Sequence, residues 1–158
     1  MSAVWLLAIL VGEPEPVTMQ GIGSLRIGLP VAALRERFGA TLAEGQDPDD
    51  HCTYWTSSPH PELGLMVVGG RLVRIDIDTA AYRTRSGVRI GMSEREIRGI
   101  YGARMRVEVH PYTHPDGKYL VYQARGEPYG LIIETDHGRA VSMRVGYWES
   151  VQWIEGCS

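Results

Sequence analysis

Apolar and polar side chains alternate with a period of two along several stretches, which is the pattern of strands with one buried face. In the stretch 71–78 one predicted face carries Val73, Ile75 and Ile77, and the other carries Leu72, Arg74, Asp76 and Asp78. In the stretch 119–122, Tyr119 and Val121 share one face, and Leu120 and Tyr122 share the other. One apolar face per strand predicts an antiparallel sheet that helices cover on one side and water covers on the other.

Glycine pairs and short polar runs mark the predicted turns between these strands. Gly69-Gly70 predicts a tight hairpin between the stretches 65–68 and 71–77. The stretch 135–138 predicts a longer turn at the corresponding place in the second half of the chain.

Two short amphipathic stretches predict helices. The second begins with a capping box in which Ser93 is the N-cap and Glu96 is the third helical residue. The first has Pro30 in the corresponding place, and we expect Pro30 to fill the first helical position. Helices of eight or nine residues are unstable alone, so we expect both to lie against the sheet.

The two halves of the chain repeat each other. Residues 24–29 align with 87–92 at an offset of 63, and the stretches 64–67 and 70–75 align with 130–133 and 138–143. Each half therefore reads as a short helix followed by a strand meander. The predicted fold class is α+β, with two tandem repeats at about 21–84 and 85–158 that form a single domain with the helices on one face of the sheet.

Residues 1–20 differ from the rest of the chain. The run 3–11 is apolar throughout, and 12–16 is a polar linker rich in proline. Nine apolar residues are too few for a transmembrane span and fit the core of an export signal. We therefore expect an extracytoplasmic protein, periplasmic or secreted. The alternative is a cytoplasmic protein whose apolar N-terminal segment packs on the domain.

The two cysteines belong to no zinc-binding spacing. In an oxidising compartment Cys52 and Cys157 could pair and hold the C-terminal tail against the first half of the chain. The alternative is two free, buried thiols in a cytosolic protein.

Composition and charge narrow the range of partners. Apolar residues make up 44% of the chain and charged residues 22%, which is typical of a globular domain. A net charge of -3 argues against general nucleic-acid binding. The stretch from Arg83 to Arg106 carries seven arginines against Glu94 and Glu96, so it could meet an acidic partner. The alternative is an ordinary solvated helix face.

Aromatic and arginine side chains supply the candidate binding residues. An open sheet face of this composition is typical of protein-binding hot spots. The candidates are Tyr112, Tyr119, Tyr122, Arg74, Arg144 and Trp148. We therefore expect a non-catalytic binding or inhibitory module whose partner is another protein of unknown identity.

A proline-rich segment offers the competing chemistry. His110, His114 and Asp116 could ligate a divalent metal, and a small-ligand or metal-binding protein is the alternative function. Both histidines precede a proline, which favours extended backbone and places them on no common face. The chain contains no recognisable activated nucleophile, so no cofactor is expected and an enzyme of unrecognised type is the third hypothesis.

Several motifs carry a resemblance to known families. An Arg-Ile-Gly-Leu/Met element before each short helix, followed by a meander, resembles the tandem modules of the β-lactamase inhibitor protein family. It resembles more distantly the small lipoprotein of the outer-membrane β-barrel assembly machinery. The cysteine placement and the segment 110–116 depart from the inhibitor, so inhibition of a β-lactamase does not carry over.

The whole domain is more similar to an uncharacterised family of small exported bacterial proteins. The shared features are a Gly-Ile-Gly-Ser-Leu-Arg-Ile-Gly start, a Cys-x-Tyr strand, a His-Pro-Tyr segment, a Glu-Thr-Asp-x-Gly-Arg hairpin and an Ile-Glu-Gly-Cys end. This resemblance implies the fold and the compartment and implies no chemistry.

Overall fold

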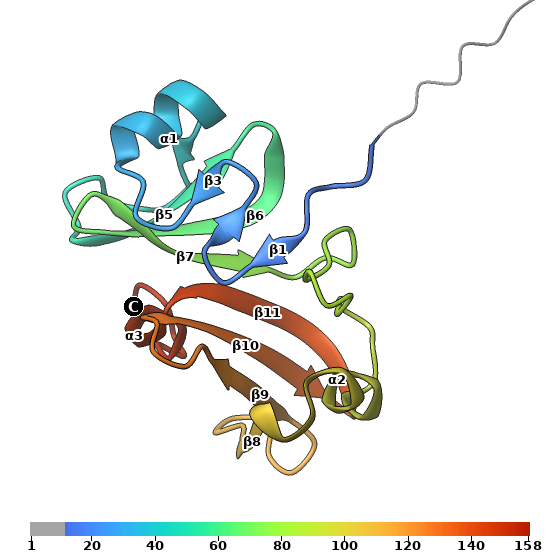
Figure 1. The fold of residues 1–158 in the computed structure, drawn as a ribbon. Coiled ribbons are helices and arrows are strands. Elements are labelled where there is room, and N and C mark those ends of the chain that lie inside the picture. Colours follow the sequence, from blue (N-terminus) through green and yellow to red (C-terminus); the bar gives the residue numbers. More distant parts are fainter. Residues whose placement is uncertain (1–11) are drawn as a thin grey trace, which may run out of the picture.

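The computed structural model describes residues 12–158, and the apolar run 3–11, predicted to be an export-signal core, lies outside the described residues. The fold is a mixed α+β fold dominated by antiparallel sheets (Figure 1). The helices are α1 (Val31–Phe38), α2 (Glu94–Tyr101), the 3-10 turn η1 (Gly102–Arg104) and α3 (Trp148–Val151). The short strands β1 (Val17–Thr18), β2 (Gly21–Ile22) and β3 (Leu25–Arg26) form a small sheet of their own.

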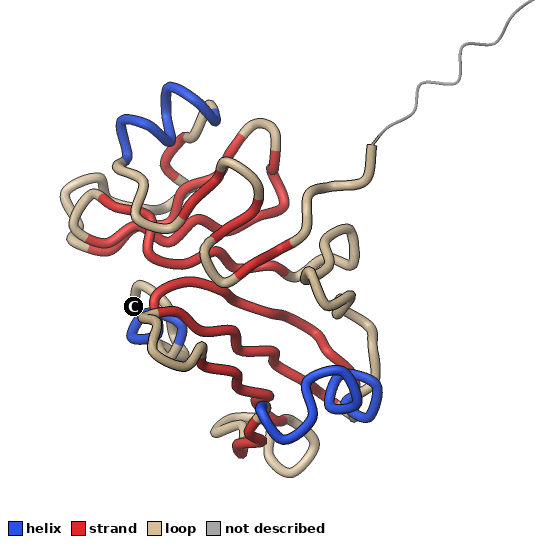
Figure 2. The backbone as a smooth tube through the Cα atoms, in the orientation of Figure 1, coloured by secondary structure: helices blue, strands red, loops and turns tan. Residues whose placement is uncertain are grey.

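An eight-stranded sheet forms the body of the molecule, in the order β4-β5-β6-β7-β11-β10-β9-β8. Its first four strands are β4 (Thr41–Leu42), β5 (Cys52–Ser57), β6 (His60–Val68) and β7 (Arg71–Ile77). The other four are β8 (Arg106–Val109), β9 (Lys118–Gln123), β10 (Tyr129–Asp136) and β11 (Arg139–Tyr147). Two meanders therefore meet at the central antiparallel pair β7–β11 (Figure 2). In this pair Ile75 lies opposite Val145.

The main hydrophobic core lies on one face of this sheet. Leu34 and Phe38 of α1 and Ile97 and Tyr101 of α2 belong to the same buried cluster as the sheet residues. Val17 of β1 is also in that cluster, so the packed part of the chain includes residues directly after the predicted linker 12–16. Among residues 12–158, no helix is long and apolar enough to cross a membrane.

Local signals predict the second helix better than the first. In α2 the Ser93 side chain accepts a hydrogen bond from the Glu96 N–H at 3.2 Å, and the Glu96 carboxylate accepts from the Ser93 N–H at 2.8 Å, which is the predicted capping box. In α1 the prediction that Pro30 fills the first helical position is wrong. Pro30 is the N-cap, because its ψ of 152° is extended and the helix begins at Val31.

The two central hairpins have turns of the same length. Gly69 and Gly70 both have positive φ, as expected for a two-residue turn. The longer turn predicted at 135–138 is wrong, because β10 and β11 are also joined by two residues, His137 and Gly138. His137 adopts a φ of 47°, which is uncommon for a residue with a side chain. Its backbone N–H donates to the Asp116 carbonyl at 3.1 Å, which holds this turn against the loop between β8 and β9.

A bulge changes the predicted faces of β7. Met66 lies opposite Arg74 and Val67 lies opposite Leu72, so Val73 has no partner in β6. This shift places Leu72 in the main core beside the other inward residues of β7. The predicted pairing of Val73 with Ile75 on one face is therefore wrong at Val73.

The second face of the sheet is not left open to water over its centre. α3 packs against β10, β11 and β7. Val151 of α3 forms a second buried cluster with Tyr119, Val121 and Ile132, and Trp148 packs against that cluster. These strand residues alternate with Leu120 and other residues of the main core, so α3 lies on the opposite face from α1 and α2.

Candidate functional site

The C-terminal segment, residues 148–158, covers the second face of the sheet, and several contacts hold it there. Cys157 is joined to Cys52 of β5 by a disulfide with a Cα–Cα distance of 5.3 Å. Gly156 lies directly against Tyr54, because a Cβ at position 156 would lie 2.5 Å from the Tyr54 hydroxyl oxygen. A disulfide of this kind is compatible with an oxidising compartment.

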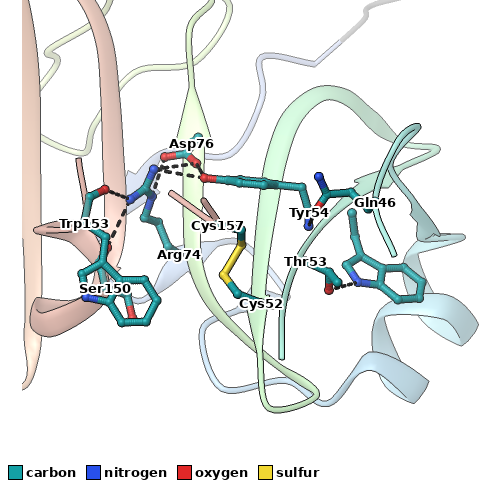
Figure 3. The surroundings of a disulfide bond; sticks show 10 residues. Gln46, Cys52, Thr53, Tyr54, Arg74, Asp76, Ser150, Trp153 and Cys157 are labelled. Carbon is teal, nitrogen blue, oxygen red and sulfur yellow. Dashed lines mark hydrogen bonds and ion pairs between the residues drawn. A yellow bond between two sulfur atoms is a disulfide. The ribbon is translucent and has the colours of Figure 1, made fainter. Parts of the chain in front are cut away.

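Arg74 connects the sheet to the backbone of the C-terminal segment (Figure 3). Its Nη1 donates to the carbonyls of Ser150 at 3.2 Å and Trp153 at 2.6 Å. Its Nε donates to Asp76 Oδ1 at 2.7 Å. All three acceptors carry full or partial negative charge, so the buried guanidinium is compensated.

Tyr54 completes this network. Its hydroxyl donates to Asp76 Oδ2 at 2.9 Å and accepts from Arg74 Nη2 at 3.1 Å. Burial, and then the negative charge of Asp76, raise the pKa of Tyr54 to about 12. Tyr54 therefore keeps its proton and acts as a donor over the whole neutral range.

Arg144 of β11, the strand that pairs with β7, also binds the C-terminal segment. Its Nε donates to the Val151 carbonyl at 2.6 Å, and its Nη1 donates to Glu134 Oε2 at 3.3 Å. Its guanidinium carbon lies 5.2 Å from the centre of the Tyr119 ring. The Tyr119 hydroxyl is buried and makes no hydrogen bond within residues 12–158. Both arginines thus bind carbonyls of the C-terminal segment.

The structure does not present the predicted aromatic and arginine face as a free surface. Arg74, Arg144 and Tyr119 are each 5% exposed, because α3 and the tail cover them. Trp148 and Tyr122 are half-buried. Tyr112 is 67% exposed, and its hydroxyl contacts the Glu155 carboxylate. Three of the six candidates are therefore inaccessible, and they hold the C-terminal segment in place.

His110 anchors the loop that follows β8. Its Nδ1 accepts from the backbone N–H groups of Tyr112 at 3.1 Å and Thr113 at 3.2 Å. Because Nδ1 is an acceptor, the proton lies on Nε2, which is 2.6 Å from Glu134 Oε1 and donates to it. Both ring nitrogens of His110 are therefore engaged within the fold.

The other two candidate metal ligands lie apart from His110. Asp116 Oδ2 is 3.6 Å from His137 Nε2, on the turn between β10 and β11, and His114 is exposed in the loop. Within the described part of the chain, no group of three or more His, Cys, Asp or Glu side chains is arranged to hold a metal ion.

A cleft of about 420 Å³ lies on the other face of the sheet, between the two halves of the chain. Its buried walls include Tyr101 of α2, Leu131 of β10 and Val145 of β11. The exposed residues around it are Ser86 and three arginines, Arg26 of β3, Arg85 of the loop after β7, and Arg104 of η1. We call it the arginine cleft. It combines an apolar floor with a cationic rim.

No Asp or Glu lines the arginine cleft itself. Glu127 lies beside it, where its carboxylate accepts from Gln20 Nε2 at 3.0 Å and borders an adjoining surface with Arg104. Among residues 12–158, none of the three arginines of the cleft forms an ion pair, whereas Arg83 pairs with Glu13 and Arg106 with Glu108. Arg104 Nε donates to the Tyr101 carbonyl at 3.1 Å, and its guanidinium carbon lies 5.9 Å from the centre of the Tyr122 ring. These contacts orient Arg104 and leave its charge uncompensated.

The arginine cleft uses only part of the basic stretch that the sequence singles out. Arg85 and Arg104 come from the stretch 83–106, while Arg95 and Arg98 of that stretch border a different surface around α2. Arg26 comes from the first half of the chain, where the sequence marks it as part of the repeated Arg-Ile-Gly element and not as a binding residue. Tyr122 is the one predicted binding residue that lines the cleft.

Comparison with known proteins identifies no family. No family model matches the chain, and no curated protein matches it. Among solved structures, the uncharacterized protein YfeY from Escherichia coli aligns with a TM-score of 0.48 and 12% sequence identity. The alignment covers 83% of this chain and 99% of that chain.

Proposed function

We propose that this protein is a non-catalytic binding module that receives an acidic segment of a partner protein in the arginine cleft. The observation that carries the proposal is the combination of three guanidinium groups that form no ion pair within residues 12–158 with an apolar floor and no lining carboxylate. Arginine suits this task because its planar fork binds a carboxylate through two parallel hydrogen bonds.

The energies of ion pairing and of apolar burial indicate what the arginine rim and the apolar floor each contribute to binding. An exposed ion pair contributes only about 0–1 kcal/mol, so the rim alone would bind weakly. Apolar burial contributes roughly 25 cal/mol per Å². Leu131 and Val145 are only 2% and 1% exposed, so the floor offers little apolar area beyond the Tyr122 ring, and binding requires both parts of the cleft. The arginines then select ligands that carry negative charge close to an apolar group.

We also propose that the protein is exported and that its chain is a tandem repeat. The disulfide supports export. The repeat has boundaries near 21–84 and 85–158. Arg71 Nη1 donates to the Gly28 carbonyl at 2.9 Å, and Arg139 Nη1 donates to the Gly91 carbonyl at 3.0 Å. These equivalent contacts lie at the aligned positions of the two halves and support the repeat.

The experiment uses a fluorescent peptide of alternating glutamate and leucine, with a glutamine and leucine peptide as its uncharged counterpart. Anisotropy should show binding of the acidic peptide only, and binding should weaken as salt increases. The variant Arg85→Gln/Arg104→Gln should weaken binding about tenfold or more, which is about 1.4 kcal/mol.

The matched control is Arg95→Gln/Arg98→Gln, which removes the same charge from α2 outside the cleft. Its affinity should stay close to that of the wild type. Equal losses in the two variants would show that only net charge matters. Equal binding of the two peptides would show that the arginines select nothing, and either result contradicts the proposal.

A small amphipathic anion is the second candidate ligand, and the cleft volume of about 420 Å³ favours it. Pockets for small ligands have volumes of roughly 300–1,000 Å³. Decanoate and decanol provide the test, because both cover the floor and only decanoate carries charge. Binding of decanoate without binding of the acidic peptide would favour this candidate over a partner protein.

A further inference from the structure

Strand β8 forms one edge of the eight-stranded sheet, and its outer side faces no other strand of residues 12–158. All four of its residues are exposed, including Val107 at 42% and Val109 at 63%. Proteins usually shorten, charge or cover such edges because unpaired backbone groups attract other strands. β8 is short and carries two charges, as protected edges do, but it also keeps two exposed valines, so this edge can accept a partner strand.

The hydrogen bonds to β9 show which backbone groups of β8 point outward. Beyond the end of β8, the His110 N–H donates to the Gly117 carbonyl at 3.3 Å, in register with the β8–β9 pairing. In an antiparallel ladder every second residue directs both backbone groups to the same neighbour. Arg106 and Glu108 therefore direct theirs toward β9, and Val107 and Val109 direct theirs away from the sheet.

The sequence of β8 is complementary to itself in one register. If two copies pair antiparallel with Val107 opposite Val107 of the second copy, Arg106 lies opposite Glu108 of the second copy. The symmetry repeats that pairing, so the junction holds two opposite-charge pairs. These pairs fall at the positions that lack backbone hydrogen bonds, where the facing side chains are closest.

Neighbouring registers lose this complementarity. A junction centred on Arg106 or on Glu108 places like charges opposite each other, which destabilises a strand pair. A junction centred between Val107 and Glu108 places the charged residues opposite valines. Only the register centred on Val107 satisfies both the charges and the apolar pair.

We propose that β8 is a homodimerisation edge through which two copies join their sheets about a two-fold axis at Val107. The partner is a second copy of this chain because the edge is self-complementary, as an isologous contact requires. The contact is independent of the arginine cleft, which neither Arg106 nor Glu108 lines. A strand of four residues buries little area, so the dimer is weak and forms at high protein concentration.

Charge reversal tests the register directly. The variants Arg106→Glu and Glu108→Arg each place like charges across the junction, and each should raise the dimer dissociation constant about tenfold or more. An equimolar mixture of the two variants restores both opposite-charge pairs and should associate as the wild type does. The double variant Arg106→Glu/Glu108→Arg should also recover the wild-type dimer.

Sedimentation velocity over a concentration series provides the readout, starting from the monomer mass of 17.6 kDa. The two side chains are 56% and 51% exposed, and circular dichroism checks that every variant is folded. Loss of the pair within one chain affects both single variants and cannot explain recovery on mixing. A wild type that stays monomeric, single variants that dimerise normally, or a mixture that fails to associate would each overturn the proposal.

Discussion

Removal of the disulfide clasp should destabilise the fold by an amount that follows from its position in the chain. The Cys52–Cys157 bond closes a loop with a sequence separation of 105 residues. In the chain-entropy model, a loop of this length restricts the unfolded state by about 4.7 kcal/mol at 25 °C. The Cys52→Ser/Cys157→Ser variant should therefore lose about 4–5 kcal/mol of unfolding free energy.

The folded state should lose much less, because other contacts hold most of the C-terminal segment. Arg74 and Arg144 bind carbonyls as far along as Trp153, and Val151 is fully buried. The native structure of the variant should therefore keep α3 in place, and the destabilisation should arise mainly in the unfolded state.

Equilibrium unfolding in urea, followed by circular dichroism, measures this loss. With a slope of roughly 2 kcal/mol/M, the midpoint should fall by about 2 M. Wild-type protein under reducing conditions is the control and should unfold like the double variant. A loss of about 1 kcal/mol or less in both samples would refute the entropic reasoning. Loss of native near-ultraviolet dichroism in the variant would show that α3 depends on the disulfide.

Four further substitutions probe the polar network and the loops. Tyr54→Phe should lower the free energy of unfolding in urea by about 1–3 kcal/mol, because it removes a hydrogen-bond partner of both Arg74 and Asp76. Tyr119→Phe should leave the free energy of unfolding unchanged or raise it slightly, because the hydroxyl it removes makes no hydrogen bond within residues 12–158. His110→Phe should speed hydrogen exchange at the two amides that donate to its ring, and unchanged exchange would argue against its anchoring role. A hydrogen bond from Asp136, together with its negative charge, raises the pKa of His137 above its ordinary value of 6.5, so an NMR titration should give a higher midpoint that Asp136→Asn lowers. Protonated His137 therefore stabilises this turn fully below pH 6.5, and the stabilisation is lost as the pH rises through the folded-state pKa. A midpoint of His137 that is not raised would contradict its interaction with Asp136.

Features that depend on neighbouring residues in the chain could be predicted from the sequence. The capping box of α2 requires only Ser93 and Glu96, and the Gly69-Gly70 hairpin requires only two residues that tolerate positive φ. The alternation around Leu120 follows from strand geometry alone. These features depend only on residues close together in the sequence, so tertiary packing does not alter them.

Features that depend on distant parts of the chain could not be predicted. The bulge at Val73 depends on the register of β6, which no pattern within β7 specifies. The burial of Arg74 depends on carbonyls 76 and 79 residues away, and an arginine beside two aspartates reads as a solvent-facing residue. Arg26 and Arg104 line the same arginine cleft although they lie in different halves of the chain, and only the three-dimensional fold places them there.

The most direct test of the proposed function is to locate the acidic peptide on the protein. Methyl and amide NMR spectra, recorded as the glutamate and leucine peptide is added, report every site it touches. If the peptide binds in the arginine cleft, the largest shift changes fall on Leu131, Val145, Tyr101 and Tyr122, the residues that form its floor and wall. Shift changes confined to the C-terminal segment or to α2, with Leu131 and Val145 unchanged, would contradict the proposed function.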